Sequence, residues 1–64
     1  MRNWIDSVKD GVPVSSLHLG GEDFAEIRPH NGKYVLYSCN DTRKVEESSH
    51  QTFEEARKEA EAWT

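Results

Sequence analysis

The sequence contains a single cysteine, Cys39, and no long apolar run. One cysteine cannot form an internal disulfide, whereas small secreted domains usually depend on several. No stretch approaches the roughly 18 apolar residues that a membrane span needs, and the first residues lack the basic and then apolar order of a secretory signal. We therefore expect a cytoplasmic protein with no membrane-bound segment and no membrane partner.

Large aliphatic residues and phenylalanine are also scarce. Valine, isoleucine, leucine and phenylalanine together make up only 12 of the 64 residues. Such a low share, combined with high net charge, is typical of disordered chains. The net charge is only −4, however, and the chain has two residues each of tryptophan, tyrosine and phenylalanine. We expect one small folded domain over residues 1–64, whose core is too small to support a large substrate pocket together with catalytic machinery.

The residues that could perform catalysis or bind a metal are few and scattered. The soft metal ligands lack the two close pairs of small zinc sites; they are His18, His30, Cys39 and His50. Gly20-Gly21 lacks the lysine and hydroxyl residue of a phosphate-binding loop. Adjacent glutamates such as Glu46-Glu47 point in different directions and do not form an acid–base pair across a cleft. We predict no catalytic residues, no cofactor, no metal site and no enzymatic activity.

The first ten residues have the pattern of a short amphipathic helix. Trp4, Ile5 and Val8 share one side of such a helix, and Gly11 would end it. A helix this short is not stable alone and must dock on the rest of the domain. A weak strand over residues 14–19 follows, where leucines alternate with polar residues.

A β-hairpin is predicted over residues 24–38. Its two strands are rich in β-branched and aromatic residues, and Asn31-Gly32 between them tolerates the positive φ angles of a type I′ turn. The alternation of a strand places Tyr34 on one face and Tyr37 on the other, so one tyrosine is turned away from the core. Residues 43–47 add a charged edge strand.

A C-terminal helix is predicted from Phe53 to about Trp63. Residues 52–55 fit the capping box, in which Thr52 accepts a hydrogen bond from the amide of Glu55 and the Glu55 carboxylate reaches back. One narrow apolar stripe runs along this helix; it consists of Phe53, Ala56, Ala60 and Trp63. The predicted fold class is therefore α+β, with a small antiparallel sheet of three or four strands, one C-terminal helix packed on it, and a short N-terminal helix or extended segment.

Negative charge is concentrated at the C-terminal end. Residues 46–64 contain six glutamates against one arginine and one lysine, which accounts for the whole net charge of −4. Our first hypothesis is a non-enzymatic protein-interaction module, an inhibitor or adaptor, that presents this acidic helix to a basic surface on a partner protein. The residues predicted to make the contact are Glu54, Glu55, Glu59 and Glu61.

The predicted sheet supports a second hypothesis, because an aromatic residue among cations can stack bases while the cations hold phosphates. The residues predicted for such nucleic-acid contact are Arg28, Lys33, Tyr37 and Arg43. A third hypothesis is a structural subunit that self-associates through Trp4 and Trp63. We expect a monomer or a weak homodimer.

The run Gly32–Tyr37, followed by Thr52–Ala56 and Trp63, resembles the three-strand-plus-helix DNA-binding modules at the N-termini of tyrosine integrases. The resemblance covers the hairpin, the edge strand and the helix, and it implies DNA contact through the sheet. The strands carry fewer basic residues than the pattern of that family. In size and acidity the chain is also similar to small phage proteins that inhibit a host enzyme by binding it.

Overall fold

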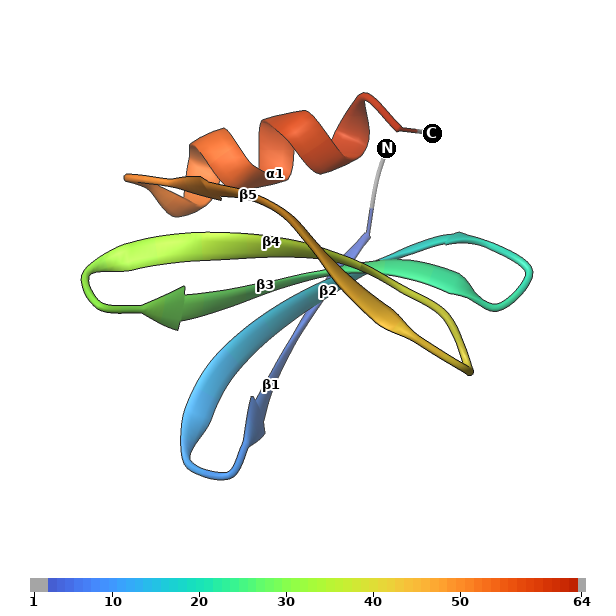
Figure 1. Ribbon diagram of the computed structural model, residues 1–64, viewed down its shortest axis with the longest axis horizontal. Coiled ribbons are helices and arrows are strands. Elements are labelled where there is room, and N and C mark those ends of the chain that lie inside the picture. The colour runs from blue at the N-terminus through green and yellow to red at the C-terminus, as the bar shows by residue number, and fades with distance from the viewer. Residues whose placement is uncertain (1–2, 64) are drawn as a thin grey trace.

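The computed structural model describes residues 3–63, which form five strands and one helix (Figure 1). The elements are β1 (Trp4–Lys9), β2 (Val12–Gly20), β3 (Asp23–His30), β4 (Lys33–Cys39), β5 (Lys44–His50) and α1 (Phe53–Glu61). Each strand pairs antiparallel with the next, which gives one sheet of order β1-β2-β3-β4-β5. The predicted α+β class is confirmed, but the sheet has five strands where three or four were expected.

The N-terminal segment is a strand, so the expected helix over the first ten residues is wrong in its described part, and the alternative of an extended segment is the one that the structure shows. Residues 1–2 lie outside the described residues. β1 pairs with β2 along its whole length, from Trp4 opposite Leu17 to Lys9 opposite Val12. Asp10 has a φ of 54° and Gly11 a φ of 78°. Positive φ at two successive residues is typical of a two-residue hairpin turn, which reverses the chain and lets β1 pair with its neighbour.

The predicted central hairpin is confirmed. β3 and β4 pair from Phe24 opposite Cys39 to His30 opposite Lys33, and the turn residues Asn31 and Gly32 have φ angles of 51° and 79°. The expected strand over residues 14–19 is confirmed within the longer β2, and the expected edge strand corresponds to β5.

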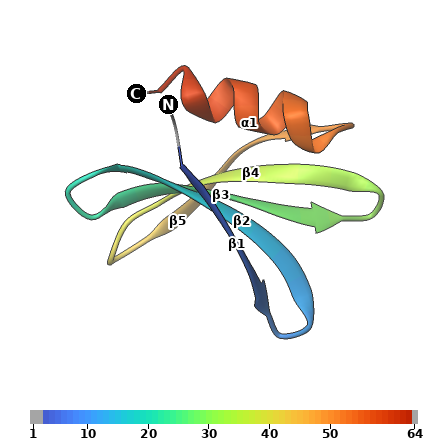
Figure 2. The same ribbon diagram turned by 180° about the vertical axis from the view of Figure 1, so that it is seen from behind.

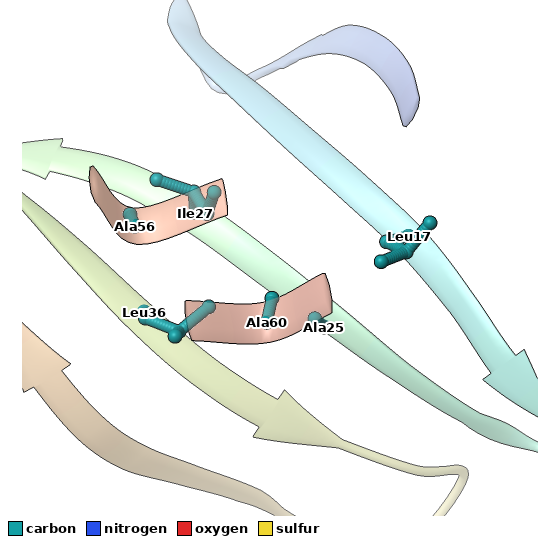
Figure 3. Packing of buried hydrophobic residues seen from close by; sticks show 6 residues of the cluster. All are labelled: Leu17, Ala25, Ile27, Leu36, Ala56 and Ala60. Atoms are coloured by element: carbon teal, nitrogen blue, oxygen red, sulfur yellow. The ribbon is translucent and has the colours of Figure 1, made fainter. Parts of the chain in front are cut away.

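The helix covers one face of the sheet, above β3, β4 and β5 (Figure 1). Ala56 and Ala60 carry small side chains that let the helix approach Ile27 and Leu36 closely (Figure 3). Tyr34 adds to this core, since its ring centroid lies 5.1 Å from that of Phe53. The buried cluster consists of Leu17, Ala25, Ile27, Leu36, Ala56 and Ala60.

The helix begins as predicted but ends earlier. The Thr52 hydroxyl accepts a hydrogen bond from the Glu55 amide at 3.1 Å, and the Glu55 carboxylate accepts one from the amide of Gln51 at 3.2 Å. The helix ends at Glu61, two residues before the predicted end at Trp63. Trp63 is exposed, so the apolar stripe that packs on the sheet ends at Ala60.

The sheet is strongly twisted, and the tips of the β1–β2 and β4–β5 hairpins both point to the side opposite the helix (Figures 1 and 2). A bulge in β5 affects which residues face that side. Tyr37 is opposite Glu46, but the next residue back along β4, Leu36, is opposite Ser48. Glu47 is therefore the extra residue, which lets Glu46 share the uncovered face with Tyr37 while Ser48 faces the helix.

Candidate binding face on the uncovered side of the sheet

One face of the sheet is left uncovered by α1, and we call it the helix-free face. Cross-strand partners share a face of a sheet, so the register identifies its members. Glu26 at its centre is opposite Ser16 on β2 and Tyr37 on β4, and Tyr37 is in turn opposite Glu46 on β5. The polar and aromatic residues of the helix-free face include Lys9, Ser16, Glu26, Arg28, Lys33, Tyr37, Lys44 and Glu46.

Glu26 is surrounded by three cations. Its side chain is only 1% exposed, and its carboxylate accepts hydrogen bonds from Lys44 Nζ at 2.7 Å and from Lys9 Nζ at 3.3 Å. Arg28 Nε lies 3.7 Å from Glu26 Oε2, the same oxygen that Lys44 contacts. In a flat sheet β1 and β5 would each lie roughly 10 Å from β3. Both lysines reach Glu26 because the two hairpin tips bend toward this side.

The electrostatics of this Glu26 cluster, formed by Glu26, Lys9, Arg28 and Lys44, favour an anion. Burial by itself raises the pKa of Glu26, but the hydrogen bonds and charges of Lys44 and Lys9 hold that pKa below its usual range. The carboxylate is therefore ionised at neutral pH and compensates one of the three positive charges. Two positive charges remain uncompensated within the cluster, which makes this part of the face a favourable place for a negatively charged ligand.

Tyr37 lies between two hollows on the helix-free face. Lys44 Nζ is 4.9 Å from the centroid of its ring, within the range of a cation–π contact. The larger hollow has a volume of about 450 Å³, and Tyr37, Lys33 and Glu46 contribute to its lining. The smaller hollow, of about 230 Å³, is lined in part by Tyr37 and Arg28. A flat ligand group could contact the tyrosine while an anionic group meets a cation nearby.

The structure brings together three of the four residues that the sequence predicted for nucleic-acid contact. Arg28, Lys33 and Tyr37 lie on the helix-free face. Arg43 does not lie within a strand, but in the β4–β5 turn, where Asn40 accepts from its amide at 2.9 Å. The sequence prediction did not include Lys9, Lys44 and Glu26. The position of Lys9 could have been inferred from the Asp-Gly turn signal that follows it.

The four glutamates predicted for protein contact are in different situations. Glu54 and Glu55 are exposed in the first turn of α1, although Glu55 also caps the helix. Glu59 accepts a hydrogen bond from Ser48 at 3.1 Å and lies 3.0 Å from His50 Nε2. Glu61 accepts from the indole N–H of Trp4 at 2.9 Å. Two of the four carboxylates therefore join the helix to the sheet.

The two tryptophans also differ. Trp4 packs within the molecule, because its indole bonds to Glu61 and the Arg57 guanidinium carbon lies 5.4 Å from its ring centroid. The same guanidinium carbon lies 4.7 Å from the centroid of the Phe53 ring, and a guanidinium nitrogen of Arg57 lies 3.4 Å from an oxygen of Asp6. Trp63 is exposed. The contacts of Trp4 therefore join β1 to the helix. Because Trp4 is engaged within the molecule, a self-association surface would have to rely on Trp63.

Cys39 and the potential metal ligands are also described by the structure. Cys39 is buried, and burial together with the negative charge of Glu26 raises the pKa of its thiol, so the reactive thiolate is disfavoured. No three histidine, cysteine or acidic side chains come together as metal ligands among residues 3–63. Over the same residues, no helix has both the length and the apolar character needed to span a membrane.

Comparisons of this chain with protein-family models, with curated proteins and with solved structures found no match. The resemblance to the integrase DNA-binding modules therefore rests on the sequence pattern alone. Function has to be argued from the site itself.

Proposed function

We propose that this protein is a non-enzymatic module that binds nucleic acid with the helix-free face of its sheet. The observation that carries the proposal is the separation of charge between the two sides of the molecule. Among the described residues, four cations lie on the helix-free face with two carboxylates, Glu26 and Glu46. The helix on the other side carries four glutamates against Arg57 and Lys58. The cations are Lys9, Arg28, Lys33 and Lys44.

This separation explains how a chain with a net charge of −4 could bind a polyanion. At about 0.1 M salt, exposed charges that lie more than about 10 Å apart are largely screened from each other. A ligand close to the sheet therefore responds mainly to the nearby cations and much less to the charges of the helix. Tyr37 adds an aromatic ring for stacking with a base, and attraction between charges alone would not require such a ring. Stacking on an aromatic side chain combined with cations that contact phosphates is the common mode of single-strand recognition.

The test measures binding of a fluorescently labelled single-stranded oligonucleotide by anisotropy at several salt concentrations. Lys33→Ala and Lys44→Ala should each weaken binding and lower the slope of log affinity against log salt by about 0.7, the value of one single-strand phosphate contact. Lys58→Ala is the matched control, because it removes the same charge from the exposed side of the helix. Equal losses in all three variants would refute a role for the helix-free face.

A protein partner with a basic surface remains the second candidate function, and it rests on the exposure of Glu54 and Glu55. Its prediction differs from the first. A protein captured by wild type and by Lys44→Ala, but lost from Glu54→Lys, would support contact through the helix. A partner lost from Lys44→Ala alone would assign protein binding to the sheet instead.

A further inference from the structure

The larger hollow contains a carboxylate that the Glu26 cluster does not explain. Glu46 is exposed and lies directly across from Tyr37. Among residues 3–63 its side chain makes no ion pair and no hydrogen bond. Glu26, on the other side of Tyr37, is neutralised by three cations. The two carboxylates that flank Tyr37 are therefore not equivalent, and only Glu46 is available to a ligand.

The remaining lining of the hollow is mixed, because Val35 contributes an apolar side chain and His30 an imidazole ring beside charged and polar groups. Lys33 contributes a cation, while Asn31 and Ser49 contribute an amide and a hydroxyl. Glu46 would repel a phosphate group, so a simple anion is a poor occupant. A ligand that fits must offer negative charge to Lys33, a flat ring to Tyr37 and hydrogen-bond donors to Glu46. A nucleotide has these three features together.

A carboxylate in the position of Glu46 would favour some bases over others. A carboxylate has two acceptor oxygens and forms its strongest contacts with two parallel N–H donors. Guanine offers two adjacent donors, N1–H and the N2 amino group, on its Watson–Crick edge. Thymine and uracil offer one N–H between two carbonyl oxygens, which a carboxylate repels. The Watson–Crick edge is accessible only when the base is unpaired.

We propose that the larger hollow binds an unpaired guanine of single-stranded nucleic acid, an inference that rests on the proposed function. The ring contacts Tyr37, the Watson–Crick edge donates two hydrogen bonds to the Glu46 carboxylate, and Lys33 contacts the adjacent phosphate. The volume of about 450 Å³ lies within the range of small-ligand sites. The smaller hollow beside Arg28 would extend the path of the nucleic-acid strand past the other side of Tyr37.

The test compares labelled oligothymidylates that differ at one central position, which holds guanine, hypoxanthine or thymine. Hypoxanthine keeps N1–H and lacks the N2 amino group, so it removes a single donor. We expect the guanine strand to bind about tenfold more tightly than the thymine strand, with hypoxanthine between them. Annealing the guanine strand to its complement should abolish the preference.

Glu46→Gln should remove the preference for guanine while leaving the affinity for plain oligothymidylate equal or higher, because a repulsive charge is lost. Glu47→Gln is the matched control, since it removes an exposed carboxylate from the adjacent residue of β5. It should keep the preference. Far-ultraviolet circular dichroism should show that both variants are folded.

The outcomes separate this inference from the function on which it rests. Salt-dependent binding that is weakened by Lys44→Ala, but is equal for all central bases, would overturn the guanine site and leave the nucleic-acid function in place. A preference that persists in Glu46→Gln would also overturn it. Absence of binding to any strand would reject both the function and the site.

Discussion

The Glu26 cluster should contribute measurably to folding, and Glu26→Gln tests this directly. The substitution keeps the shape of the side chain but removes the charge that Lys44 and Lys9 contact at 2.7 and 3.3 Å. It also turns an N–H₂ group toward these cations. Because the buried carboxylate has three cationic partners, its replacement loses several favourable contacts at once.

The expected magnitude follows from the exposure of the partners. Hydrogen bonds to charged groups contribute about 1.5–3 kcal/mol each, but Lys9 and Lys44 are 56% and 41% exposed, so water screens them. Exposed pairs contribute at most about 1 kcal/mol each. We therefore expect Glu26→Gln to lower the free energy of unfolding by about 2 kcal/mol, a large part of the roughly 3–10 kcal/mol typical of a domain of this length.

Urea denaturation followed by tryptophan fluorescence measures this change. Glu46→Gln is the control, because Glu46 lies on the same face and is exposed, and its substitution should change stability by less than about 0.5 kcal/mol. Equal urea midpoints for wild type and Glu26→Gln would refute the reasoning, because the contacts between the carboxylate and the cations would then not contribute to the free energy of unfolding.

Local signals in the sequence predicted much of the fold. Asn31-Gly32 and Thr52 each determine the backbone over a few residues, and the hairpin and the helix start follow from them. The first strand was missed because Trp4 and Val8 are spaced as on a helix. The preference between helix and strand was decided by the Asp10-Gly11 turn and by pairing with β2, which is a tertiary contact.

The candidate binding face was only partly predictable for the same reason. Strand alternation was enough to separate Tyr37 from Tyr34. The burial of Glu26 depends on lysines that approach it from both outer strands of the sheet, β1 and β5. That approach requires five strands and a strong twist, and neither follows from the residues around Glu26. A buried carboxylate among cations is therefore a property of the assembled sheet.

The remaining predictions concern the helix, the hairpin turn and pH. Phe53→Ala should lower the free energy of unfolding by about 2–3 kcal/mol through lost packing on Tyr34, and Thr52→Ala by about 1 kcal/mol through the lost cap; urea melts measure both. Gly32→Val should cost at least about 1 kcal/mol in the same assay, because φ is +79° there, although a Cβ would meet no atom within 4 Å. Finally, the stability of the wild type should fall more steeply than that of Glu26→Gln as the pH decreases from about 5 to 3. The folded-state pKa of Glu26 is lowered by its lysine partners, which outweigh the opposing effect of burial. Its contribution is therefore complete above the unfolded-state pKa of about 4.3 and is lost as the pH falls through the lower folded value. Parallel stability curves for the two proteins over this range would contradict an ionised, cation-bound Glu26.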